Sequence, residues 1–190
     1  MSAARMPRDA SEPLDVTIAL MARRDVRHVM PIEQRVYPRG WSKSVFIREI
    51  AQRTTRCYLT AKVGSTLAGY AGMLLSPDEA HITNVAVSPE WQRHKVATRL
   101  LLTQARVAVV RGAKALTLEV RPSNDGAKEL YRRFGFAPAG MRKLYYRDPD
   151  EDGLIMWAHD IDSPAYVTRL AGIEAEVNGR TFVDAEVWQT

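Results

Sequence analysis

The apolar residues in the first half of the chain change their spacing several times, and each spacing predicts an element. Residues 24–36 and 42–50 carry apolar side chains every three or four positions, which predicts two helices. Pro31 lies inside the first helix and is expected to interrupt it, because proline removes a helical hydrogen bond. Apolar runs predict strands over residues 14–21, 57–63, 66–75 and 80–88, of which the last three are expected to form an antiparallel meander.

The second half of the chain alternates between helical and extended patterns. Residues 92–111 predict a long amphipathic helix that ends at Gly112. The pattern then predicts a strand over residues 115–120, a helix over 124–134, strands over 139–146 and 153–159, and a last helix over 164–177. The residues after this helix show no clear pattern. The order of elements indicates the fold class α/β, with a single mixed, mostly antiparallel sheet and helices on both faces.

Length and composition favour one folded domain. The chain has 190 residues, of which 46% are hydrophobic, and this is enough to build a core without disulfides or metal. Residues 1–13 mix small, charged and proline residues without periodicity, and they are predicted to form a disordered leader. The folded domain is expected over residues 14–161, followed by a C-terminal extension over 162–190 to which the sequence assigns no role.

Cysteine content and charge restrict the cellular locations and the binding partners that the sequence predicts. The single cysteine, Cys57, lies in an apolar run, which predicts a buried structural thiol and a reducing, cytoplasmic location. No segment approaches the ~18 uninterrupted apolar residues of a membrane span, so no membrane partner is expected. The net charge of +5 permits a polyanionic partner. However, the basic residues are dispersed and no aromatic platform accompanies them, so no direct nucleic acid contact is expected.

A possible anion site follows the third strand of the meander. Residues 92–97 lie between the end of that strand and the start of the long helix, where unpaired N–H groups and the helix dipole suit a phosphate. Arg93, Lys95 and Arg99 add positive charge, which makes better sense if an anion is bound. A basic, solvated helix start explains the same spacing equally well.

The same segment resembles the central motif of the GNAT acetyltransferases, Q/R-x-x-G-x-G/A. Residues 84–89 (Asn-Val-Ala-Val-Ser-Pro) and 92–97 (Gln-Arg-His-Lys-Val-Ala) carry the resemblance, with Lys95 at the first glycine position. In that family the strand edge pairs with the pantetheine arm of acetyl-CoA and the turn holds its pyrophosphate. The resemblance implies acetyl-CoA, without a metal, bound by Val85, Ala86, Val87, Gln92, Arg93, His94, Lys95, Val96, Ala97, Thr98, Asn124 and Tyr131.

Glu119 is unusual for its position. Alternation along residues 116–120 places Thr117 and Glu119 on one face of a strand that is otherwise apolar. Glutamate is disfavoured in such a strand, so Glu119 needs a partner or a task. The two readings are a buried ion pair, with Arg121 or a helix arginine, and a catalytic carboxylate. Further along, Asn124 can cap the next helix, and Tyr131 can be a core residue of that helix.

A longer set of segments resembles one GNAT branch, the RimI-like ribosomal-protein alanine N-acetyltransferases of bacteria. Residues 118–124, 130–136 and 142–146 carry it, together with residues 32–34 and 41–42, so that it spans roughly residues 16–161. The resemblance implies that Glu119 is the general base, that Tyr131 is the acid that protonates the departing thiolate, and that Asn124 contacts the cofactor. It also implies acceptor contacts from Glu33, Trp41, Tyr145 and Tyr146.

The chemistry of amines favours one acceptor class. The pKa of an α-amine is ~7.7–8.0 and that of a lysine amine is ~10.4, so a far larger fraction of an N-terminal amine is already neutral at pH 7 and needs no base. The predicted acceptor is the N-terminal α-amine of a protein, with a basic ribosomal protein as the favoured partner. The alternatives are a GNAT enzyme acting on a small-molecule amine and a non-catalytic acyl-CoA-binding module. The acidic run Asp148, Asp150, Glu151 and Asp152 is either a solvated turn or an attractor for a basic substrate.

Overall fold

The computed structural model describes residues 12–189, and residues 1–11 of the predicted leader lie outside them. The strands are β1 (Val16–Leu20), β2 (Arg56–Val63), β3 (Thr66–Leu75), β4 (Glu79–Val87), β5 (Ala115–Val120), β6 (Ala137–Tyr146), β7 (Glu151–His159) and β8 (Thr181–Val183). The helices are α1 (Val26–Val36), α2 (Lys43–Ile50), α3 (Val96–Val110), α4 (Asp125–Arg133) and α5 (Pro164–Ala175), with short 3₁₀ turns η1 (Pro89–Trp91) and η2 (Ala185–Trp188).

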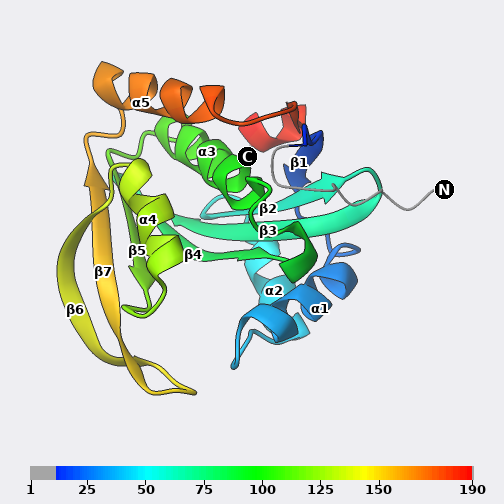
Figure 1. Cartoon of the computed structure of the whole chain (residues 1–190), viewed down its shortest axis with the longest axis horizontal. Helices are drawn as coiled ribbons and strands as arrows, with labels where there is room; N and C mark the ends of the chain where they lie inside the picture. The colour runs from blue at the N-terminus through cyan, green and yellow to red at the C-terminus, as the bar shows by residue number, and fades with distance from the viewer. Residues whose placement is uncertain (1–11, 190) are drawn as a thin grey trace.

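The strands form one sheet in the order β6-β7-β5-β4-β3-β2-β1-β8. Neighbouring strands are antiparallel except for the pairs β4–β5 and β1–β8, which are parallel. Helices α3, α4 and α5 cover one face and helices α1 and α2 cover the other (Figure 1). The predicted mixed, mostly antiparallel sheet with helices on both faces is therefore confirmed. Among residues 12–189, none of the helices combines the length and the apolar character needed to cross a membrane.

The two faces of the sheet bury separate clusters of side chains. On the α3 side, Leu100 and Leu101 pack against alternate residues of β4 and β5, such as Ile82 and Leu118. On the other side, Val29 of α1 belongs to a smaller cluster that also contains residues of α2, β2 and β3. Cys57 is fully buried in the first cluster, and burial raises the pKa of its thiol to about 12, as expected of a structural cysteine.

Two helix predictions were wrong in detail. Helix α1 continues through Pro31, which lies on its exposed side, so water can solvate the carbonyl that loses its helical hydrogen bond. Helix α3 begins at Val96 rather than at residue 92. Arg93 and Lys95 have φ angles of 67° and 60°, which a right-handed helix cannot contain. Residues 92–95 therefore form a turn between η1 and α3.

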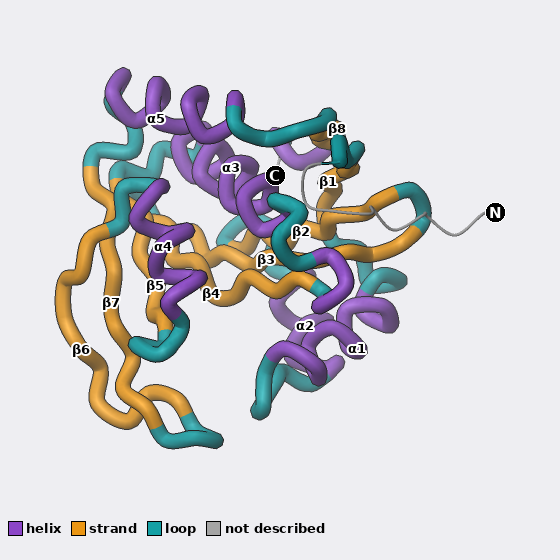
Figure 2. The backbone as a smooth tube through the Cα atoms, viewed as in Figure 1, coloured by secondary structure: helices purple, strands orange, loops and turns teal. Residues whose placement is uncertain are grey.

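The sheet opens between β4 and β5. These two strands pair only where residues 79–81 of β4 face residues 115–117 of β5. Beyond this point β4 continues along β3 to Val87, whereas β5 continues along β7 to Val120. The strands diverge in both backbone views, and α3 begins beside the free end of β4 (Figures 1 and 2). A ligand can therefore reach backbone groups of β4 that no strand pairs with.

Arg99 does not contribute to the turn as expected. Its side chain is buried, with only 1% of the residue exposed, and it donates hydrogen bonds to residues just before β1 and around the start of β8. Atom Nη2 donates to the carbonyl oxygens of Leu14, at 2.8 Å, and Asn178, at 2.5 Å, and Nη1 donates to the hydroxyl of Thr181. A buried arginine needs such acceptors, because it cannot lose its charge. The sequence pattern did not predict β8, whose position depends on these contacts.

Removing the Arg99 side chain is expected to destabilise the fold. Arg99→Ala leaves the buried Leu14 carbonyl without the Arg99 donor and removes one donor from the Asn178 carbonyl, so the free energy of unfolding should fall by ~2–4 kcal/mol in a urea titration. Arg106→Ala is the matched control on the same helix, since Arg106 pairs with Glu174 at the surface and should cost under ~1 kcal/mol. Equal losses in the two variants would contradict the clamping role of Arg99.

Candidate active site

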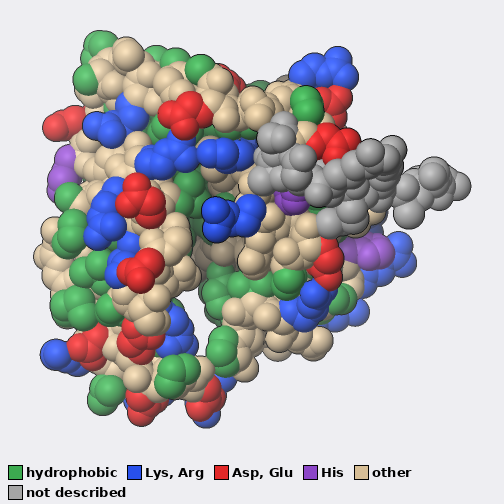
Figure 3. Space-filling model, viewed as in Figure 1, with side chains coloured by type: hydrophobic (Ala, Val, Ile, Leu, Met, Phe, Trp, Pro, Cys, Tyr) green, Lys and Arg blue, Asp and Glu red, His purple; other side chains and the backbone are tan. Residues whose placement is uncertain are grey.

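The turn before α3 is shaped to receive an anion. Lys95 is the N-cap residue of α3 and makes no side-chain capping bond, so the first N–H groups of the helix are left for a ligand. Gln92 holds the turn against the end of β4, because its Nε2 donates to the Val87 carbonyl at 3.3 Å. In the space-filling view, basic side chains lie beside a hollow between the α4 side and the α1 side of the molecule (Figure 3).

The backbone conformation at Lys95 is one that favours glycine. Its φ of 60° and ψ of 15° lie in the left-handed region, which costs an L-residue roughly 1–2 kcal/mol. The residue is half-buried at the start of α3. Several of the predicted cofactor residues have buried side chains and can offer only backbone groups to a ligand: Ala86, Val87, Val96 and Thr98.

Glu119 projects from β5 close to the point where β4 and β5 diverge, on the face opposite to Leu118. One carboxylate oxygen, Oε2, lies 3.2 Å from Nε2 of His81, and the other, Oε1, lies 3.2 Å from Nη1 of Arg142. The His81 imidazole, with help from Arg142 and Tyr145, lowers the pKa of Glu119 although burial opposes this. The carboxylate is thus held ionised.

The partners of Glu119 were not those expected from the sequence. Arg121 instead pairs with Glu151, with 3.2 Å between Nη1 and Oε2. His81 and Arg142 were missed as site residues. The alternation of β4 places His81 on the same face as Thr83, which is a signal for one strand. Which polar residues of two strands meet depends on the parallel register, and local pattern does not reveal that register.

Tyr131 lies on the α4 side of the same opening. It is buried with its ring 5.8 Å from the ring of Phe136, and burial raises the pKa of its phenol to about 12. Burial, and to a smaller extent the nearby Tyr131, raises the pKa of the Tyr37 and Tyr146 phenols. Tyr37 reaches the free edge of β4 there, because its hydroxyl donates to the Val85 carbonyl at 2.9 Å.

Asn124 has the structural role that its position suggested. Its Oδ1 accepts a hydrogen bond from the N–H of Ala127 at 3.1 Å and so caps α4. Its side-chain acceptor is therefore engaged, and its amide N–H₂ is the group that can still contact a ligand.

Glu33 is a second buried carboxylate, on the α1 side of the opening. Its Oε1 accepts a hydrogen bond from the N–H of Trp41 at 2.6 Å, whereas its buried Oε2 has no hydrogen-bond partner among residues 12–189. Burial raises the pKa of Glu33 to about 7. The Trp41 ring packs on Phe46 and Tyr58, with centroids 5.6 and 6.3 Å apart. Glu33 is therefore a carboxyl group that ionises near pH 7 and has one oxygen that can accept a further hydrogen bond.

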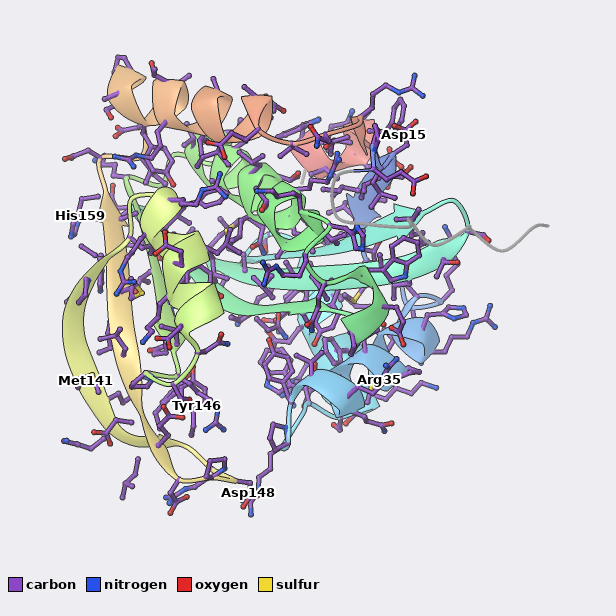
Figure 4. The ribbon with its side chains drawn as sticks, viewed as in Figure 1. Asp15, Arg35, Met141, Tyr146, Asp148 and His159 are labelled. Carbon is purple, nitrogen blue, oxygen red and sulfur yellow. The ribbon has the colours of Figure 1, made fainter. Side chains whose placement is uncertain are left out.

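The β6–β7 hairpin forms the other side of the site. The rings of Tyr145 and Tyr146 lie 5.0 Å apart at the end of β6, and the guanidinium of Arg142 lies 5.1 Å from the Tyr145 ring. At the hairpin tip Asp148 forms an ion pair with Arg39 of the α1–α2 loop (Figure 4). The hairpin and the loop therefore meet across the site.

The acidic run at this hairpin is electrically compensated. Each of its carboxylates pairs with a basic side chain: Asp148 with Arg39, Asp150 with Arg147, Glu151 with Arg121, and Asp152 with Lys143. Paired charges produce a weak field at a distance. The structure therefore favours the solvated turn over the attraction of a basic substrate.

Comparison with known proteins decides the family. A family model described as "Acetyltransferase (GNAT) family" matches residues 26–136, which include the opening, the turn and helix α4. The chain belongs to the GNAT acetyltransferase family. Acetyltransferases of this family use acetyl-CoA, which fits a sheet opening that leads to an anion-binding turn.

Relatives of this GNAT acetyltransferase share most of their length with it. A protein of Bacillus subtilis named "Putative [ribosomal protein bS18]-alanine N-acetyltransferase" is 38% identical over 70% of this chain and 88% of its own. "N-alpha-acetyltransferase RimI" of Mycobacterium tuberculosis is 35% identical over 74% of this chain and 90% of its own. The crystal structure of the ribosomal-protein-S18-alanine N-acetyltransferase from Escherichia coli has a TM-score of 0.70 and 32% identity, covering 76% of this chain and 94% of its own.

Glu33 is expected to make the stability of the GNAT domain depend on pH. Because its pKa is raised to about 7, the folded protein keeps a proton that the unfolded chain has already released. The free energy of unfolding should therefore fall as the pH rises from ~4.5 to ~7, by up to ~3 kcal/mol. Glu33→Gln removes this dependence and should stabilise the protein at pH 8 but not at pH 4. Identical pH dependence of urea unfolding in the two proteins would show that Glu33 is not buried as a neutral acid.

Proposed function

We propose that this GNAT acetyltransferase transfers the acetyl group of acetyl-CoA to the N-terminal α-amine of a protein, with a ribosomal protein that begins with alanine as the favoured substrate. The observation that supports the proposal is the Glu119 carboxylate, held between His81 and Arg142 beside the point where β4 and β5 diverge. The names of the Bacillus and Escherichia relatives support the choice of acceptor.

Acetyl-CoA is proposed to enter where β4 and β5 diverge. The backbone of residues 85–87 would pair with the pantetheine arm, and residues 92–98 would hold the pyrophosphate at the start of α3. The amide of Asn124 would add a contact from α4. In this proposed pose the thioester would lie between Tyr131 and Glu119.

Tyr131 is proposed to protonate the departing thiolate. An alkyl thiol ionises near ~8.5, so the leaving group is a weak base at neutral pH and needs only a nearby donor. Burial keeps the Tyr131 phenol protonated over this whole range, because its pKa is raised to about 12. The hydroxyl therefore stays a donor while negative charge develops on the sulfur.

Glu119 is proposed to supply the carboxylate of the general base, acting on the acceptor amine directly or through an intervening group. Its lowered pKa keeps it ionised in the range in which an α-amine titrates. Glu33, Trp41, Tyr145 and Tyr146 are proposed to border the acceptor, and the free Oε2 of Glu33 suits the donors of an amine or a peptide N–H.

The proposed function is tested with a panel of peptides. Peptides that begin with alanine, serine or methionine are compared with N-terminally blocked copies that contain lysine, and with a polyamine. Mass spectrometry locates the acetyl group, and release of CoA gives the rate. The free alanine peptide should exceed its blocked copy by at least ~100-fold in kcat/KM, because far more of its amine is neutral. Acetylation confined to the blocked peptides or to the polyamine would contradict the proposal.

The role of Tyr131 is tested by Tyr131→Phe, which keeps the packing against Phe136 and removes the hydroxyl. The kcat for the alanine peptide should fall by ~10²-fold while the Kd of acetyl-CoA, measured by calorimetry, changes by less than ~3-fold. Tyr166→Phe is the matched control, because Tyr166 is a buried tyrosine of α5 in the same core cluster. Unchanged turnover in Tyr131→Phe would remove Tyr131 from the reaction.

A further inference from the structure

Glu119 is enclosed by other side chains. His81 and Arg142 each lie 3.2 Å from one of its two oxygens, and the Tyr145 hydroxyl is a third hydrogen-bonding neighbour. Only 6% of the Glu119 side chain is exposed, compared with 28% of the His81 side chain. The imidazole is therefore the member of this pair that a substrate can reach.

His81 also has the right position in the sheet. It is the last residue of β4 that pairs with β5, opposite Thr117, and the two strands separate directly after it. On its other side it pairs with Leu74 of β3. Its side chain leaves the sheet on the face of Glu119, which is the face where α1, α2 and the proposed acceptor residues lie. The ring thus stands at the closed end of the opening.

We propose that His81, with Glu119 behind it, is the group that takes the proton from the acceptor amine. This inference rests on the proposed function and refines one of its steps. The Glu119 carboxylate accepts the Nε2–H of the imidazole and fixes its tautomer, which leaves the lone pair of Nδ1 for the substrate. Imidazole is the side chain whose ordinary charge change lies between pH 5 and 8, close to that of an α-amine. Glu119 is then a positioning residue.

The proton balance is complete with these groups. The α-ammonium gives one proton to Nδ1 of His81, and the neutral amine attacks the thioester carbonyl to form the new C–N bond. The C–S bond then breaks, and the thiolate takes the proton of the Tyr131 hydroxyl. The acetylated nitrogen loses its second proton, which restores the Tyr131 hydroxyl. His81 releases its proton to water, so that the products are the amide, CoA and one proton.

Other charged and titratable groups near His81 could also affect the pH dependence of kcat. Glu119 faces it from β5, and Arg142 and Tyr145 face it from β6 through the Glu119 carboxylate. Tyr58 of β2 reaches the neighbouring Thr83, with 3.3 Å between the hydroxyl oxygens. Glu33, with its pKa raised to about 7, is a second group at this site that could give a pH dependence. The test has to separate His81 from Glu33.

The test compares His81→Gln with wild type, because glutamine can still donate to Glu119 but cannot take up a proton. The kcat for the alanine peptide should fall by ~10²- to 10⁴-fold, and the fall of kcat toward acid pH should disappear. The Kd of acetyl-CoA should stay unchanged. His28→Gln is the matched control, since His28 lies on the exposed side of α1 and should keep both rate and profile. An acid limb that survives in His81→Gln but vanishes in Glu33→Gln would overturn the proposal.

A second measurement needs no turnover. Proton–nitrogen correlation NMR of the imidazole ring, assigned by the signal that His81→Gln lacks, should show the Nε2–H tautomer in wild type and its loss in Glu119→Gln. An Nδ1–H tautomer in wild type would overturn the proposal. Wild-type enzyme that acetylates no α-amine peptide refutes the proposed function, whereas active wild type with an equally active His81→Gln refutes only the role of His81.

Discussion

The short parallel pairing of β4 and β5 is the constraint on which the site depends. Only residues 79–81 and 115–117 pair, because β4 then follows β3 and β5 follows β7. The separation exposes a strand edge inside a sheet, which a folded protein keeps only if another group satisfies it. Tyr37 satisfies the Val85 carbonyl, so pairing of a pantetheine arm with that carbonyl would exchange one donor for another.

The two buried carboxyl groups beside this opening, Glu119 and Glu33, have pKa values shifted in opposite directions. Glu119 lies beside His81 and Arg142, and the hydrogen bond from His81 and the charge of Arg142 outweigh the cost of burial. Glu33 has one backbone donor, so burial dominates and its pKa rises. The ionised Glu119 carboxylate beside an imidazole suits proton transfer. The Glu33 carboxyl, whose Oε2 has no hydrogen-bond partner among residues 12–189, suits binding of a hydrogen-bond donor.

The C-terminal extension belongs to the same core as the rest of the domain. Leu170, Ile173 and Val187 are buried beside residues of α3, and Arg99 joins Leu14 to Asn178 and Thr181. The carbonyl of Lys95 accepts the N–H of Arg99 at 3.1 Å, so the clamp is one helical turn from the anion-binding turn. The C-terminal extension therefore packs on α3 and is held to its first turn through Arg99.

Local pattern determined most of the elements, the faces of Glu119 and Leu118, the cap at Asn124 and the family, because periodicity and motif spacing are properties of neighbouring residues. Tertiary structure alone decided which distant groups meet. Arg99 was predicted to add charge to the turn, and instead it joins Leu14 to residues 178–181. Residues 92–95 carry a helical pattern but form a turn with positive φ angles. The neighbours His81 and Arg142 of Glu119 follow from strand register, which is a long-range property that no local pattern encodes.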